Sequence, residues 1–103
     1  MSKVLVLMKR KNGMSYADFR KWALNDHPEF AKAIPGMRGY RMNVPVQEVA
    51  DAPYDAISEM WFDSADARDA GLGSDPGKAA GADAAAHCEH RFRFVAEERV
   101  VIS

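Results

Sequence analysis

The sequence predicts an α+β fold in which helices cover one face of a four-stranded antiparallel sheet. Three observations support this prediction. Four short segments are rich in apolar and β-branched residues, and capped helical segments follow the first and the third of them. No internal repeat or low-complexity linker divides the 103 residues, so we expect a single domain over residues 1–103. The resulting order β-α-β-β-α-β is that of the ferredoxin-like split βαβ motif.

The four strands are predicted from their apolar patterns. The first has apolar residues at successive positions, which is typical of a strand covered on both faces. In the second, Gly39 and Pro45 favour a bulge and an edge position. The third has bulky apolar groups on both faces, and the fourth alternates apolar and polar residues. The strands are expected at residues 3–9, 37–47, 54–63 and 92–102.

The segment from Ser15 to Gly39 is predicted to hold the first helix and the main candidate for chemistry. Ser15 can cap the helix, with Asp18 three residues on. Pro28 disfavours helical geometry at the preceding residue, so we expect the helix to end at His27. Pro28 would then begin a second short helical turn with His27 as its N-cap, where the imidazole would tend to stay neutral.

A second helical region is predicted after the third strand. Ser64 can cap a helix of about eight residues. Ser74, followed by Asp75 and Pro76, can cap an alanine-rich helix. Residues 87–91 are expected to form a polar connection to the last strand.

The composition excludes several classes of protein. The net charge is −1, so there is no basic excess for nucleic-acid binding. The apolar run at residues 4–8 is too short for a signal peptide, and no stretch approaches membrane length. The single cysteine, Cys88, excludes an intrachain disulfide. We therefore expect a cytoplasmic protein that does not bind nucleic acid or membranes.

His27 and Glu59 are the two candidates for acid–base chemistry. His27 could move a proton or polarise a substrate, or it could be a structural N-cap. Glu59 lies in an apolar strand, where a carboxylate needs a partner. It could pair with an arginine such as Arg41 or Arg93, contact a second copy of the chain, or act beside His27. Asp26 could orient the imidazole or face solvent.

Several aromatic side chains could line a ligand pocket, although residues at such spacings commonly form the core. Tyr40 and Trp61 each carry a polar group that could orient a ligand. The candidate ligand-binding residues are Tyr16, Phe19, Trp22, Tyr40 and Trp61.

Other motifs favour neither a metal nor a cofactor. His87, Cys88 and His90 offer three potential ligands but no fourth at zinc-type spacing, so a solvated connection is the simpler interpretation. Cys88 has no evident activating group. The sequence contains no phosphate loop or dinucleotide fingerprint.

The chain resembles the EthD family of dimeric α+β barrel proteins over nearly its whole length. The resemblance rests on the order and spacing of KVLVLMKRKNGMSYADFRKWALNDHPEF, IPGMRGY, PYDAISEMWFDS, SDPGKAA and FRFVAEERVV. It implies that two copies pack sheet against sheet, which agrees with strands that are apolar on both sides and a chain too short to cover them itself. It also implies a site between sheet and helices, with His27 as its polar group.

The resemblance implies two classes of function. The first is a small cofactor-free enzyme acting on an aromatic, cyclic or polyketide-type compound by isomerisation, decarboxylation or a related lyase step, with His27 as a proton shuttle. The second is a non-catalytic dimeric protein that binds a hydrophobic ligand or assists an oxygenase. A haem-dependent or cofactor-free monooxygenase is a weaker alternative. Fold alone does not decide among these.

Overall fold

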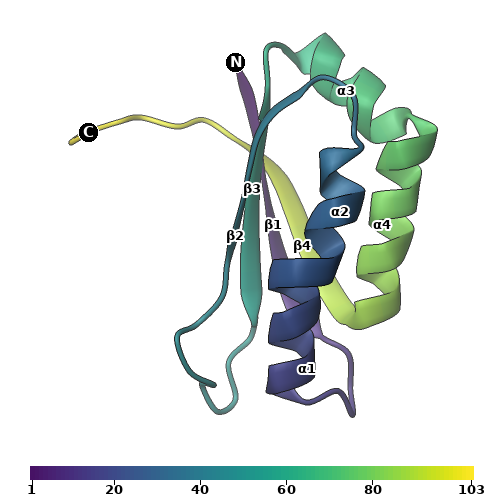
Figure 1. Cartoon of the computed structure of the whole chain (residues 1–103). Coiled ribbons are helices and arrows are strands. Elements are labelled where there is room, and N and C mark those ends of the chain that lie inside the picture. Colours follow the sequence, from purple (N-terminus) through teal and green to yellow (C-terminus); the bar gives the residue numbers. More distant parts are fainter.

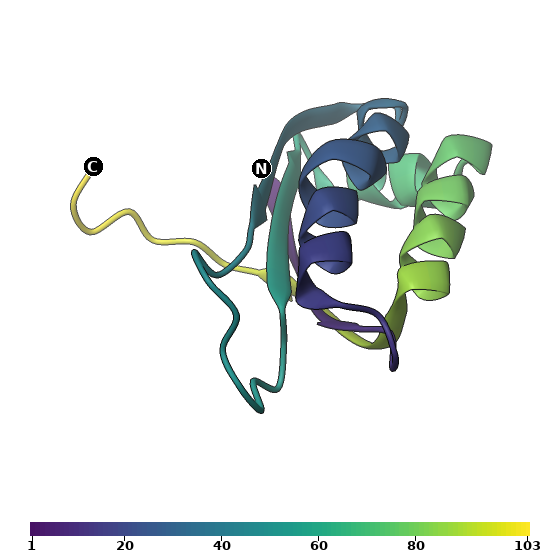
Figure 2. The same ribbon diagram turned by 60° about the horizontal axis from the view of Figure 1, so that its bottom comes forward.

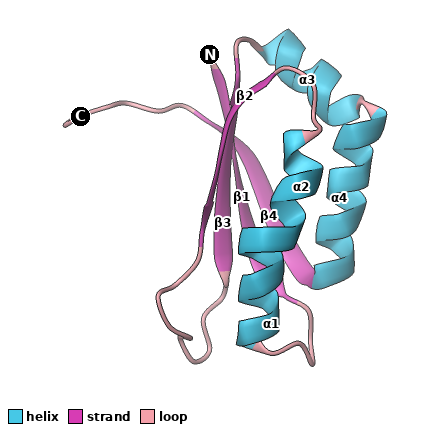
Figure 3. Ribbon diagram, in the orientation of Figure 1, coloured by secondary structure: helices cyan, strands magenta, loops and turns pink.

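The computed structural model describes all residues 1–103 and has two layers, a sheet and a set of helices on one of its faces (Figures 1 and 2). Neighbouring strands are antiparallel, and their order across the sheet is β2-β3-β1-β4. This arrangement confirms the predicted ferredoxin-like α+β fold (Figure 3). The elements are β1 (Ser2–Arg10), α1 (Tyr16–Lys21), η1 (Trp22–Asp26), α2 (His27–Lys32), β2 (Met37–Asn43), β3 (Ala56–Phe62), α3 (Ala65–Gly73), α4 (Asp75–His87) and β4 (Cys88–Ala96).

The core lies between the sheet and the helices. Alternate residues of β1 and β3 point to this side, because successive side chains of a strand face opposite ways. Val4, Met8 and Phe62 are almost fully buried there, and Phe19 contributes from α1. Burial of such side chains stabilises a fold by roughly 1.5–3 kcal/mol each.

The first helical region is continuous, so the predicted break at His27 is wrong. His27 has helical angles, φ −61° and ψ −37°, and α1, η1 and α2 follow one another without a loop. The segment η1 is a π-helical turn in which the His27 N–H bonds to the carbonyl of Trp22, five residues earlier. This wider turn lets the chain pass through Pro28, which lies in the first turn of α2, where a missing N–H costs little. His27 is therefore not an N-cap.

The second helical region begins as predicted. The Ser64 hydroxyl accepts from the Ala67 N–H at 3.1 Å, and the Ser74 hydroxyl accepts from the Gly77 N–H at 3.1 Å. The expected polar connection at 87–91 is wrong, since α4 ends at His87 and β4 starts at Cys88.

All four predicted strands are present, but their first or last residues differ from the prediction. The second strand is an edge strand with an irregular register between Met37 and Gly39, which confirms both expectations drawn from Gly39 and Pro45. It ends at Asn43, before the proline. The last strand covers Cys88–Ala96, and residues 97–103 leave the sheet as an extended tail (Figure 2).

No helix covers the second face of the sheet, here called the open face (Figures 1 and 2). Several large apolar side chains on it are exposed, among them Ile57, Phe92 and Phe94 at 41%, 52% and 39%. Register places Leu5 beside Phe94, and Leu7 between Ile57 and Phe92. The open face is thus a continuous apolar surface over the three strands β3, β1 and β4.

None of the helices has the length and apolar character needed to cross a membrane.

Candidate functional site

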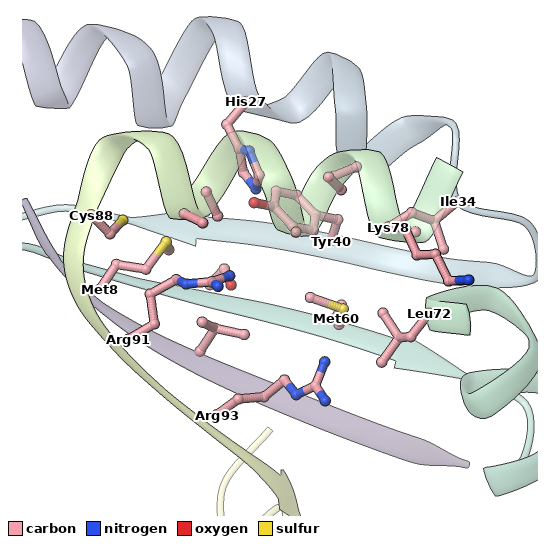
Figure 4. Close-up of a pocket in the computed structure, with 18 of the residues that line it drawn as sticks. Met8, His27, Ile34, Tyr40, Met60, Leu72, Lys78, Cys88, Arg91 and Arg93 are labelled. Atoms are coloured by element: carbon pink, nitrogen blue, oxygen red, sulfur yellow. The ribbon is translucent and has the colours of Figure 1, made fainter. Parts of the chain in front are cut away.

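A cavity of about 670 Å³ lies between the sheet and the helices α2 and α4 (Figure 4). Its volume is within the usual range of small-molecule sites. Of its 20 lining residues, 11 are hydrophobic, and they include Val6, Met8 and Met60 on the sheet and Ala84 on α4. Seven of the other lining residues have polar or charged side chains, so apolar and polar groups share the wall of the cavity.

His27 enters this cavity from the start of α2 (Figure 4). Only 7% of the surface of His27 is exposed. The Nδ1 atom lies 2.8 Å from Oδ2 of Asp83 on α4. Because a carboxylate can only accept, the neutral imidazole carries its proton on Nδ1, which leaves Nε2 with a free lone pair. This is the arrangement of a base oriented by a buried carboxylate.

Asp83 is held by more than one neighbour. Trp22 donates from Nε1 to the same carboxylate oxygen at 3.0 Å, and its ring packs against the His27 ring with centroids 4.8 Å apart. The ring of His87 also stacks on the Trp22 ring, with centroids 4.5 Å apart. The imidazole, the indole and the carboxylate thus hold one another in place, which fixes the orientation of the imidazole.

Tyr40 supplies a second polar group to the cavity, beside His27 (Figure 4). Its hydroxyl is buried and has no hydrogen-bond partner within the chain. Burial raises the pKa of Tyr40 well above its ordinary value, and the nearby Ser58 hydroxyl offsets this only in part. The phenol stays protonated and can donate to a ligand oxygen. An unpartnered buried hydroxyl is costly without such a ligand.

Three cationic side chains belong to the polar lining, which also includes Ser58 and His90. Lys78 comes from α4, and Arg91 and Arg93 come from β4 (Figure 4). Glu89 is the one carboxylate among the lining residues.

Glu59 does not meet His27, so the structure does not bring the two acid–base candidates together. Glu59 alternates with Ser58 and Met60, which face the helices, and therefore lies on the open face. Its carboxylate pairs with Lys3 at 2.9 Å and accepts from Asn43 at 3.0 Å. The Lys3 ammonium, more than any other neighbour, lowers the pKa of Glu59. Of the two arginines considered as partners, Arg41 lies opposite Glu59 in the register and also lowers its pKa, whereas Arg93 faces the helix side.

Trp61 shares the open face with Glu59 and does not line the cavity. Its indole lies over Gly39, where a Cβ atom would be 2.0 Å from the ring, and Arg41 approaches the ring to 5.2 Å. Because Gly39 has no side chain, the Trp61 indole can pack directly against the backbone of the edge strand β2.

The three aromatic residues of the first helix also lie outside the cavity lining. Phe19 is completely buried in the core, and Trp22 supports His27 from behind. The Tyr16 hydroxyl donates to the carbonyl of Pro45, which ties α1 to the loop after β2. Of the five predicted ligand-binding residues, Tyr40 is the one that lines the cavity.

The segment with His87, Cys88 and His90 shows no grouping of three potential ligands around one point. The three side chains have separate environments: His87 stacks on Trp22, His90 stacks on Tyr54 at 5.8 Å, and Cys88 lies at the cavity wall. Burial raises the pKa of the Cys88 thiol to about 11, so the thiolate that a nucleophile needs is disfavoured.

Sequence reasoning missed Asp83, Lys78, Arg91 and Arg93. Asp83 is 56 residues from His27 and lies in an alanine-rich helix without any motif. The alternation along the last strand separates Arg91 and Arg93 from Phe92 and Phe94, and that signal could have assigned the arginines to the opposite face.

A family model for the EthD domain matches residues 11–90. The chain belongs to the EthD domain family. The matched part contains every side chain of the cavity except Val6, Met8, Arg91 and Arg93. No curated protein shows a significant match to this EthD sequence.

Solved structures share the fold of this EthD domain at low sequence identity. An EthD family protein from Bacillus halodurans has a TM-score of 0.77 and 23% identity, with 96% of this chain and 100% of that chain covered. A DABB family protein from Mesorhizobium loti has a TM-score of 0.73 and 16% identity, with 96% and 99% covered. A dimeric ferredoxin-like protein of unknown function from Thermobifida fusca has a TM-score of 0.73 and 18% identity, with 91% and 87% covered.

Proposed function

We propose that this EthD domain is a small cofactor-free enzyme that moves a proton on an aromatic, cyclic or polyketide-type compound bound in the cavity. The observation that carries the proposal is the His27–Asp83 pair at 2.8 Å on the wall of an apolar cavity, next to a buried hydroxyl without a partner. A base, a hydrogen-bond donor and an apolar enclosure are the parts that proton abstraction beside a carbonyl needs.

The proposed reaction begins with the substrate carbonyl oxygen accepting a hydrogen bond from Tyr40. Nε2 of His27 takes a proton from the adjacent carbon, the C–H electron pair forms a carbon–carbon double bond, and the carbonyl electrons move to the oxygen. Asp83 stabilises the imidazolium, and the substrate has a second double bond conjugated with the enolate, so its electrons shift and the imidazolium returns the proton to the far carbon of that double bond. The step is an isomerisation without net oxidation, and the same enolate-stabilising groups serve a lyase or decarboxylase step.

We further propose that the protein is a homodimer joined through its open faces. Leu5, Leu7, Ile57, Phe92 and Phe94 form an exposed apolar surface that a second copy would cover. The Thermobifida fusca relative is described as dimeric, as are similar proteins from Bacteroides fragilis and Jannaschia. The cavity lies on the other side of the sheet, so each copy would hold its own site. The cytoplasmic location stays a prediction from sequence.

Deuterium exchange tests the proposed chemistry without knowledge of the natural substrate. In D₂O, 2-tetralone, an aromatic cyclic ketone, should exchange its α-hydrogens faster with the protein than without it, as followed by NMR. We expect His27→Gln to lose this acceleration by about 10²-fold or more, the scale of general-base catalysis. Tyr40→Phe should lose about tenfold or more through the missing donor.

The matched control is Tyr54→Phe, because Tyr54 stacks on His90 and does not line the cavity. It should exchange the ketone at the wild-type rate. Equal exchange by the His27→Gln variant and the wild type would refute the enzymatic proposal. Binding of the ketone without any exchange would favour a non-catalytic ligand-binding protein.

A further inference from the structure

The cations around the cavity have no partners of their own. The structure contains ten salt bridges, and none of them involves Lys78, Arg91 or Arg93. Some other basic residues are also outside these pairs, among them Arg20 and Arg41, so what distinguishes the three is their place in the cavity lining. The cavity therefore presents three unpaired positive charges against the single carboxylate of Glu89.

The two arginines lie on the same face of one strand. Arg91 is opposite Met8 and Arg93 is opposite Val6, and both of these β1 residues line the cavity. Positions two apart on a strand are roughly 6.6 Å apart along it, so two long side chains can reach one anion. Figure 4 shows Arg91 near Met8 on the His27 side of the cavity and Arg93 further along the strand, while Lys78 lies at the other end, beside Ile34 and Leu72.

The charges lie at the accessible part of the cavity, while its acid–base groups lie deeper. Lys78, Arg91 and Arg93 are exposed, whereas His27 and the hydroxyl of Tyr40 are buried. A ligand that satisfies both regions has an anionic group at one end and a carbonyl or hydroxyl at the other. The hydrophobic lining between them suits a cyclic or aromatic body.

We infer that the substrate is a small aromatic or cyclic carboxylate whose carboxylate group is bound by Arg91 and Arg93. A guanidinium matches the two oxygens of a carboxylate with two parallel hydrogen bonds, and such charge-assisted bonds are among the stronger ones in proteins. The inference rests on the proposed function, since it assigns the substrate class of the same cavity. It also orients the ligand, with its reacting end at His27 and Tyr40.

Calorimetric titration of the full chain tests the inference with three matched pairs of probes. The pairs are benzoate and benzamide, 2-naphthoate and 2-naphthamide, and anthracene-2-carboxylate and its amide. We expect at least one carboxylate to bind about tenfold or more tightly than its neutral amide, as charge-assisted bonds predict. Arg91→Gln and Arg93→Gln should each reduce the affinity for that carboxylate several-fold and leave the amide nearly unchanged.

The control variant is Arg20→Gln, which removes the same charge. Arg20 lies on α1, forms no salt bridge and does not line the cavity. This variant should bind the carboxylate as the wild type does. Equal affinity for acid and amide, no binding of any carboxylate, or full affinity in both cavity arginine variants would overturn the inference. Tighter binding of 2-naphthyl phosphate than of 2-naphthoate would also overturn it, by assigning the subsite to phosphate esters.

The results separate this inference from the proposed function. A carboxylate preference that depends on Arg91 and Arg93, together with proton exchange unaffected by His27→Gln, would keep the substrate class and refute the catalytic role. Proton exchange that depends on His27, together with equal binding of acids and amides, would keep the catalytic role and refute the substrate class.

Discussion

His27 depends on a single carboxylate for its orientation and its tautomer. Asp83 receives hydrogen bonds from His27 and from Trp22, at 2.8 and 3.0 Å, and is itself largely buried. Asp26 is adjacent to His27 in the sequence but is exposed and makes no side-chain hydrogen bond in the structure. Proximity along the chain thus does not identify the partner, because a helix directs neighbouring side chains about 100° apart.

We predict that Asp83→Asn weakens His27 as a base without moving its proton. Trp22 can only donate and bonds to the same oxygen as His27, so the amide oxygen of the variant takes that place and still accepts from Nδ1. Nitrogen-15 NMR of the neutral imidazole, recorded above the pH at which it titrates in each protein, should show Nδ1–H in both. Proton exchange of the ketone should fall by about tenfold or more, because the imidazolium loses the negative charge that stabilises it.

Asp26→Asn is the matched control for that experiment, since it makes the same chemical change beside His27. Its imidazole spectrum and exchange rate should equal those of the wild type. An unchanged exchange rate in Asp83→Asn would show that the charge of the carboxylate does not support His27.

At the scale of elements, close backbone approach joins the two C-terminal helices and holds α4 over the cavity. Gly77 lies in the first turn of α4, where an added Cβ would be 2.4 Å from the Gly71 carbonyl oxygen and 2.5 Å from that of Leu72. Both atoms belong to the backbone of α3 and cannot move aside as a flexible side chain can. Gly81, one turn further along α4, has no atom within 4 Å of the same position.

We predict opposite effects for alanine at these two glycines. Gly77→Ala should lower the free energy of unfolding by about 1–3 kcal/mol, because it overpacks a backbone contact. Gly81→Ala should raise it by up to about 1 kcal/mol, because alanine is the better helix former and space is available. Urea unfolding followed by circular dichroism measures both changes. Equal stabilisation by the two substitutions would show that α3 and α4 are not in close contact.

At the scale of the whole molecule, the sheet divides the chain into a helix-covered side with the cavity and an open apolar side. The helix-covered side holds the core and the acid–base groups. The open side carries Phe92 and Phe94, whose ring centroids are 5.7 Å apart. The extended tail continues from the same strand (Figure 2). The tail adds further exposed apolar groups in Val101 and Ile102, which are 82% and 91% exposed.

We predict that the protein sediments as a dimer of two 11.4 kDa chains and that Phe94→Glu dissociates it. A charge on the open face would have to be buried without a partner in the dimer, which is costly. Phe30→Glu is the control, since Phe30 lies on α2 with nearly the same exposed fraction, 40% against 39% for Phe94. Analytical ultracentrifugation should give a monomer for Phe94→Glu and a dimer for Phe30→Glu. A monomeric wild type would refute the dimer.

Sequence patterns alone predicted the fold, the caps at Ser15, Ser64 and Ser74, the irregular edge strand at Gly39 and the apolar open face. These features depend on local patterns of polarity and backbone preference, which can be read within a few residues. The sequence also singled out His27 and Tyr40, which the structure brings to one cavity.

The surroundings of His27 and Tyr40 depend on contacts between segments that are far apart in the chain. The pairing of His27 with Asp83, the separation of Glu59 and Trp61 on the other face, and the placement of Lys78, Arg91 and Arg93 in one cavity lining join residues distant in sequence. Helix α4 reaches His27 through its packing over the sheet, and no local pattern encodes that approach. The π-helical turn that keeps His27 helical before Pro28 was also decided by the fold, because the buried face of a helix outweighs the local preference of the residue before a proline.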